Sequence, residues 1–186
     1  MRSNQYAVIG LVLLLGFSLS ATASATGIGE FAVATLAGCT DPAVSGFAIL
    51  HERPSAEGVK VVDVGLTIVG LPNGKHGVHI HEVASCTPCS AAGGHFDPGP
   101  NSNSSPDGNH PFHSGDLINV EVKNGVGIMQ TTTSRVTLAA GPLSVFDANG
   151  SAFIVHVDPD TYCPAGVVAG CAGGARAACG IIRPLD

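Results

Sequence analysis

Three closely spaced histidines, His76, His79 and His81, are the first residues of this sequence whose types and spacing could do chemistry. Side chains on a β-strand alternate between two faces, so His79 and His81 would share one face, about 6–7 Å apart, and Val78 and Ile80 the other. One face would offer imidazole nitrogens and the other would feed an apolar core. An exposed pair of strand histidines is the simpler interpretation of this stretch by itself.

Further potential ligands follow along the chain at His95, His110, His113, Asp116 and His156. Copper(II) accepts imidazole nitrogen in roughly square geometry, whereas zinc takes histidine and carboxylate ligands in a tetrahedral shell. Together with the first three histidines, these residues could supply two metal sites. We set His51 aside.

The elements that would position these residues are strands. Runs with alternating or β-branched residues predict strands at residues 31–36, 44–52, 59–69, 76–82, 116–122, 125–129, 131–138, 152–157 and 176–182. Turn signals separate them, and Asn149-Gly150 is typical of a β-hairpin. Short strands and many turns predict a single all-β domain, a sandwich or a barrel.

Two long irregular stretches interrupt this pattern, at residues 83–115 and 158–175. Residues 97–109 are rich in Pro, Gly, Asn, Ser and Asp and would pass for a flexible linker. Loops of this length in a compact domain are usually functional or disordered. Because His95 precedes residues 97–109 and His110 and His113 follow them, we expect a loop that a metal holds in place.

The N-terminus has the features of a secretory signal peptide: Arg2, an apolar run over residues 7–17 and Ala-x-Ala cleavage choices before residue 26. This predicts a signal peptide at 1–25, a domain at 26–186, no membrane span in the mature chain, and export to the periplasm or the exterior. Leu36-Ala37-Gly38-Cys39 is a competing signal that would make Cys39 a lipidated N-terminus. The net charge of −6 argues against nucleic acid as a partner.

Six cysteines in an exported chain favour disulfides, but they allow 15 pairings, and spacing does not choose among them. Cys86-Thr87-Pro88-Cys89 is a CxxC sequence, which in a thioredoxin-like context would indicate redox exchange. No βαβ pattern surrounds it here, so we favour structural disulfides.

Five segments resemble motifs of the copper/zinc superoxide dismutase family, and the resemblance spans residues 31–182. They occur in the family's order and read GKHGVHIHE at 74–82, GGHFDP at 93–98, HSGDL at 113–117, VH at 155–156 and GARAACG at 174–180. The resemblance implies an eight-stranded Greek-key β-sandwich or barrel with two long functional loops. The spacing of His81 and Cys86 is similar to that of the exported bacterial branch.

The resemblance also implies roles for individual residues. Copper would be bound by His79, His81, His95 and His156. Zinc would be bound by His95, which bridges the two ions, and by His113 and Asp116. Arg176 would hold the anionic substrate beside copper, and Cys86 would pair with Cys179. His76 would support the copper ligands from behind, and Asp160 would link the two metal shells.

One zinc ligand departs from the family pattern, because residues 100–104 contain no histidine where one is usual. We interpret His110 as the displaced ligand; otherwise the zinc site would be weak or absent. Cys163 and Cys171 flank a short glycine-rich stretch and would form a local disulfide that pins the second loop. Cys39 and Cys89 are then the remaining predicted pair.

The implied function is that of an oxidoreductase, a superoxide dismutase that converts superoxide to oxygen and hydrogen peroxide with copper and zinc as cofactors. A copper-only dismutase, a non-catalytic copper/zinc carrier or scavenger of the same fold, and a disulfide-stabilised β-domain with vestigial histidines stay open as alternatives. A homodimer is one option for the assembly.

Overall fold

The computed structural model describes residues 30–99 and 103–185, and the predicted signal peptide at 1–25 lies outside these residues. The elements, in chain order, are β1 (Phe31–Gly38), β2 (Ser45–Pro54), β3 (Lys60–Val69), β4 (Gly74–His76), β5 (Val78–His81), the short 3₁₀-helix η1 (Cys89–Ala92), β6 (Val120–Lys123), β7 (Val126–Thr133), β8 (Ala152–His156), β9 (Arg176–Ile181) and β10 (Arg183–Pro184). Among the described residues, no helix is long and apolar enough to cross a membrane.

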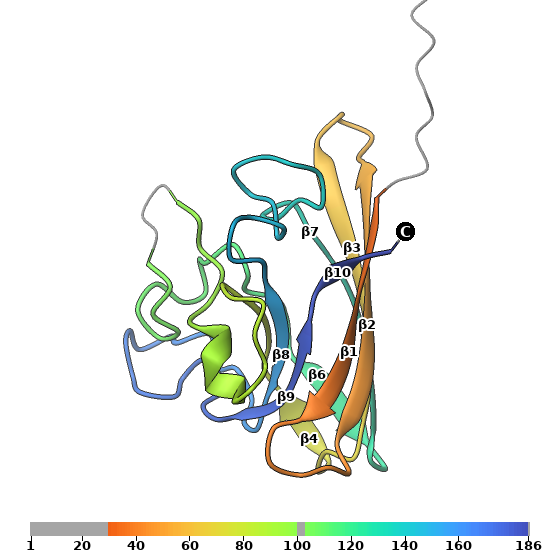
Figure 1. Ribbon diagram of the computed structural model, residues 1–186. Helices are drawn as coiled ribbons and strands as arrows, with labels where there is room; N and C mark the ends of the chain where they lie inside the picture. Colours follow the sequence, from red (N-terminus) through yellow and green to blue (C-terminus); the bar gives the residue numbers. More distant parts are fainter. Residues whose placement is uncertain (1–29, 100–102, 186) are drawn as a thin grey trace, which may run out of the picture.

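The strands form one antiparallel sheet that curls into a nearly closed barrel (Figure 1), in the order β4-β6-β7-β3-β2-β1-β9-β8-β5. β4 and β5 are separated only by Gly77, so one continuous segment supplies both edges of the sheet. The connections from β3 to β4 and from β7 to β8 join strands that are not neighbours, which is a Greek-key arrangement. With β4 and β5 counted as one interrupted strand and β10 as an extension of β9, eight strands remain, and the predicted fold class is confirmed.

Alternation along the strands builds the main core. In β2, Ala48 and Leu50 are buried, whereas Phe47 and Ile49 are 47% and 40% exposed. The inward residues of the other strands join them in one cluster that includes Val78, Ile80, Phe153 and Val155. Burial of this apolar surface is the main stabilising contribution to such a fold.

β5 and β8 differ from the other strands because they are buried on both faces. The outward residues Ala152 and Ile154 of β8 form a second small cluster with Ala92 and Cys179. The first loop, described at residues 82–99 and 103–119, covers this outer face and carries η1. The second loop, residues 157–175, lies on the same side of the barrel (Figure 1). The outward face of β5 is therefore dry, although it carries His79 and His81.

Three sequence-based expectations about strands were wrong. Residues 116–119 are not part of a strand, because Asp116 forms only an isolated bridge with His79, and β6 begins at Val120. The two runs predicted at 125–138 are one strand, β7, which ends at Thr133 where a third loop begins. Asn149-Gly150 does form a tight turn, but β7 and β8 are not sheet neighbours, so it closes no hairpin.

Disulfide bonds are present as predicted. The structure joins Cys39 to Cys89, Cys86 to Cys179 and Cys163 to Cys171. The first two attach the first loop to β1 and β9, and the third closes a short segment of the second loop. Because Cys39 is engaged in a disulfide, its thiol is not free for lipidation.

Candidate metal centre

The free edge of β5 is paired with loop backbone rather than with another strand. The N–H of Ile80 donates to Gly115 O at 2.9 Å, and the N–H of Phe96 donates to Ile80 O at 2.9 Å. Gly115 is required for this close approach, since a Cβ there would lie 2.2 Å from Ile80 O. This pairing sets His95 opposite His81 and Asp116 opposite His79.

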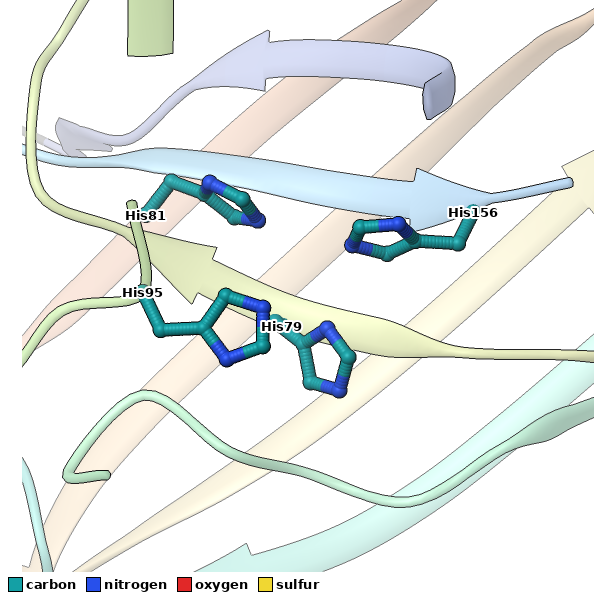
Figure 2. A group of neighbouring side chains, drawn as sticks. All are labelled: His79, His81, His95 and His156. Carbon is teal, nitrogen blue, oxygen red and sulfur yellow. The ribbon is translucent and has the colours of Figure 1, made fainter. Parts of the chain in front are cut away.

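Four histidine rings converge on one point (Figure 2). His79 and His81 come from β5 and His95 from the first loop, while His156 ends β8 at a register shift after Val155 that re-aims its side chain. One ring nitrogen from each of the four lies within 4.8 Å of the others. All four side chains are at most 2% exposed. The structure thus brings together the four predicted copper ligands.

Hydrogen bonding leaves one nitrogen of each ring free to bind a metal. Nδ1 of His81 lies 3.0 Å from Gly93 O, and Nδ1 of His156 lies 3.0 Å from Gly174 O. A carbonyl can only accept, so these nitrogens carry the proton and their Nε2 atoms present lone pairs. The four nitrogens that face the cluster, Nδ1 of His79 and Nε2 of His81, His95 and His156, are buried without a hydrogen-bond partner among the described residues.

Burial also keeps these rings in the neutral form that a metal needs. Loss of solvation lowers the pKa of His95 to about 4 and that of His156 to about 3, and it lowers the pKa of His79 and His81 as well. The cluster therefore offers four neutral imidazoles, each buried and with one ring nitrogen free of hydrogen bonds. This donor set fits copper, which prefers imidazole ligands.

A second cluster surrounds the Asp116 carboxylate. His95 Nδ1 lies 2.7 Å from Asp116 Oδ1, while Nδ1 of His110 and Nδ1 of His113 lie 3.1 Å and 3.0 Å from Oδ2. The structure therefore gathers His95, His110, His113 and Asp116, the predicted zinc set. A group of donor atoms within 4.8 Å contains His79 in place of His113. We favour His113, because Nδ1 of His79 faces the other cluster and its Nε2 faces Asp160.

Buried charges of opposite sign lie side by side in this second cluster. Burial disfavours the His110 cation, but hydrogen bonds to Asp116 and Asp160 outweigh it and raise the His110 pKa to about 9. Burial likewise opposes ionisation of Asp116, yet its three histidine partners hold its pKa well below the usual range. An ionised carboxylate among imidazoles is the donor set that zinc prefers.

Asp160 connects the two clusters. Its Oδ2 lies 3.0 Å from His79 Nε2 and 2.8 Å from His110 Nε2. Asn119 fixes it through two bonds, donating to Asp160 O and accepting from Asp160 N. Although burial opposes ionisation, the bonds to His110 and His79 lower the pKa of Asp160. The carboxylate thus orients one ring of each cluster at once.

Arg176 lies at the entrance to the four-histidine cluster. It lines a pocket of about 300 Å³ together with His156 and Asp107. Its guanidinium donates to Cys89 O at 2.5 Å and to Gly93 O, and burial lowers its pKa. Because both of these acceptors are neutral carbonyls, the positive charge of Arg176 is available to an anion in the pocket.

Asp107 ties the two loops together at the rim of this pocket. Its carboxylate accepts the N–H of Gly170 at 2.9 Å and the N–H of Ala172 at 3.1 Å. Asp107 also lies near the sulfurs of Cys163 and Cys171, but these form a disulfide and are not thiolate ligands. Asp107 lies within the Pro-, Gly-, Asn- and Ser-rich residues 97–109, where no local pattern in the sequence marks it as a contact between the loops.

His76 lies behind the site rather than in it. Its Nδ1 is 3.0 Å from His156 O and its Nε2 is 3.0 Å from Pro72 O. It therefore fixes the backbone at the end of β8, from which the His156 ring projects.

The fold and the site define a class of protein: a Greek-key β-barrel with two adjoining groups of histidine and carboxylate side chains that could hold metal ions and that share His95. The family described as copper/zinc superoxide dismutase (SODC) matches residues 44–182. The chain therefore belongs to the copper/zinc superoxide dismutase family, which is a family of enzymes, and the predicted family and enzyme class are confirmed.

Two relatives give the extent of the similarity. The chain is 35% identical over 193 aligned positions to a copper–zinc superoxide dismutase of Deinococcus radiodurans, with 94% of this chain and 95% of the relative covered. It is also similar in structure to the clock protein EA4, with a TM-score of 0.65, 26% identity, and 86% of this chain and 97% of that chain covered. Both similarities extend over nearly the whole of the relative.

Proposed function

We propose that this protein is a superoxide dismutase with copper held by His79, His81, His95 and His156, and zinc held by His95, His110, His113 and Asp116. The observation that carries the proposal is the set of four inward-facing, buried ring nitrogens without partners beside the Asp116 cluster. His95 belongs to both groups, with Nε2 on one side and Nδ1 on the other. This arrangement supports a bridged pair of metals over a copper-only site.

The overall reaction converts two superoxide ions and two protons into one dioxygen and one hydrogen peroxide. Copper held by these four histidines would supply the one-electron redox chemistry of this reaction. Arg176 binds the anion in the pocket beside His156, and the buried rings exclude water from the cluster. When His95 Nε2 is not bound to copper, it would be the atom placed to hold a proton and pass it to the departing peroxide, while Asp116 and Asp160 keep the rings in fixed orientations.

The role of Arg176 is tested by the variant Arg176→Ala, with Arg183→Ala on β10 as a matched control. Loss of the guanidinium removes a local positive charge on the path of the anion, so kcat/KM falls by roughly tenfold and depends less on ionic strength. Copper content stays at the wild-type level. An unchanged rate for superoxide consumption would contradict this role, and loss of copper would indicate a structural one.

Metal analysis of the purified chain separates the proposal from its alternatives. One copper and one zinc per chain, together with superoxide consumption, are the expected results. Copper alone with full activity would favour a copper-only dismutase. Both metals with no turnover would favour a carrier or scavenger of the same fold.

The proposal also places the mature protein outside the cytoplasm, in the periplasm or the extracellular space, after cleavage of residues 1–25. The three disulfides support an oxidising compartment. N-terminal sequencing of the exported protein is expected to begin near residue 26. A mature chain that retains Met1 would contradict this.

A further inference from the structure

Arg135 is a charged residue to which neither the sequence analysis nor the proposed chemistry assigns a role. It follows β7 at the start of the third loop. Its backbone N–H donates to Thr133 Oγ1 at 3.1 Å, and its neighbour Val136 is fully buried in the main core. Arg135 therefore projects from a fixed point of the barrel.

The guanidinium of Arg135 reaches across to the first loop. Nη1 donates to Pro111 O at 3.1 Å and to His113 O at 3.0 Å, and Nη2 donates to Asp116 O at 2.6 Å. Among the described residues it forms no ion pair with a carboxylate. These three acceptors of the guanidinium are all backbone carbonyls, and a planar group with several N–H donors can reach them together in a way that a lysine ammonium cannot.

These three carbonyls belong to the segment that carries the zinc ligands. Pro111 directly follows His110, and the other two acceptors are on His113 and Asp116 themselves. Within the segment, the N–H of Asp116 donates to His113 O at 3.2 Å, and the N–H of His113 donates to Asp116 Oδ2 at 2.9 Å. Arg135 thus fixes the outside of a turn whose inside presents the ligand atoms.

We propose that Arg135 is a positioning residue for the zinc site, and that it pre-organises the segment 110–116 before the metal binds. This inference rests on the proposed zinc ligands. A segment that is already ordered loses less conformational freedom on binding, so the metal binds more tightly. Without Arg135, binding would have to order the His110–Asp116 segment itself.

Charge alone predicts the opposite effect. A guanidinium near a divalent cation repels it, so removal of Arg135 would strengthen zinc binding if electrostatics dominated. Pre-organisation predicts weaker binding. The sign of the change in affinity therefore separates the two.

The test compares Arg135→Ala, Arg135→Lys and the matched control Arg53→Ala, whose exposed side chain pairs with Asp63 of β3. Zinc affinity is measured by chelator competition, and the melting temperature is measured with and without zinc. Arg135→Ala is expected to weaken zinc binding about 10–100-fold and to shrink the stabilisation that zinc confers. Arg135→Lys is intermediate, and Arg53→Ala binds zinc as the wild type does.

The outcomes distinguish this inference from the proposed site. If the wild type binds zinc and both Arg135 variants bind it equally tightly or more tightly, the positioning role of Arg135 is overturned and the zinc site is not. Equal losses of melting temperature with and without zinc would show that Arg135 is merely structural and would also overturn it. A wild-type chain that binds no zinc would overturn the zinc site and this inference together. If Arg135→Ala does not fold, Arg135→Lys decides.

Discussion

The two candidate metal sites share His95 but are built in different ways. In the four-histidine cluster, His79, His81 and His156 come from β5 and β8, whose backbones pair from Val78 with Val155 to His81 with Ala152. In the Asp116 cluster, His110, His113 and Asp116 all come from the irregular first loop. One cluster is thus part of the barrel, and the other is attached to it.

The difference shows what holds each set of ligands in place. Strand ligands are ordered by the sheet and by the core behind them, where Val78 and Ile80 are fully buried. Loop ligands depend on individual side-chain contacts from elsewhere, chiefly Asp160 to His110 and Arg135 to the backbone. We therefore expect the strand-borne cluster to tolerate changes in the loop better than the loop-borne cluster does.

The largest effect is expected from His81→Ala, which removes one of four strand-set nitrogens. Because the strand is rigid, no other side chain can move in to replace the missing nitrogen. Copper affinity and superoxide consumption are therefore expected to fall by more than about 100-fold, which is more than the loss of a supporting residue causes. Copper per chain and activity are the measurements, with His51→Ala on β2 as the control. Normal copper content in His81→Ala would rule out its assignment as a ligand.

His110→Ala tests the other side of the comparison. Zinc affinity is expected to fall at least about 10–100-fold, because one of four donors is lost, while the strand-set copper ligands keep most of their affinity. Both metals are measured on the same sample. If copper falls as far as zinc, the two clusters do not differ in the way described, and if zinc is unaffected, His110 is not the displaced ligand.

Asp160→Asn weakens the connection between the clusters. The neutral amide cannot accept from both His79 and His110 as the carboxylate does, so each ring loses its fixed orientation. The expected loss is about tenfold for zinc and less for copper, because β5 also restrains His79. Competition titrations with each metal provide the comparison. Equal losses for the two metals would contradict the idea that strand ligands need less support.

The smallest effect is expected far from the metals, where Glu52 anchors the third loop that carries Arg135. Its buried carboxylate accepts the N–H of Leu138 at 2.6 Å and of Ala139 at 3.0 Å, and it pairs with Lys60 at 2.6 Å. Glu52→Gln is expected to lower the free energy of unfolding by about 1–3 kcal/mol at neutral pH. Chemical denaturation measures this loss, and Glu57→Gln in an exposed turn is the control.

This loss depends on pH in a defined direction. Burial alone would raise the pKa of Glu52, but the bonds from Lys60, Ala139 and Leu138 lower it overall. The ionised carboxylate therefore contributes stability above its ordinary pKa of 4.5, and that contribution disappears as the pH falls through the lowered folded-state pKa. The difference between wild type and Glu52→Gln should shrink in acid. A difference that grows in acid would show that the carboxylate is not the stabilising group.

Much of this protein could be predicted from its sequence. Apolar and polar residues alternate along β1 to β3 because one face of each strand packs against the core. This alternation can be seen in the local sequence alone. His79, His81, His95 and His156 lie in short motifs whose spacing is preserved by strand geometry. The all-β class, the family and the presence of disulfides followed from these local features.

The tertiary structure decided the rest. The role of His110 depends on Asp116 and on Asp160, which is 50 residues away along the chain. The contacts of Arg135 and Asp107 join loops that have no regular pattern of their own, and the disulfides join cysteines up to 93 residues apart. Loop conformation is set by long-range hydrogen bonds and cross-links and not by local preference, so a loop-borne site becomes visible only when the chain is folded.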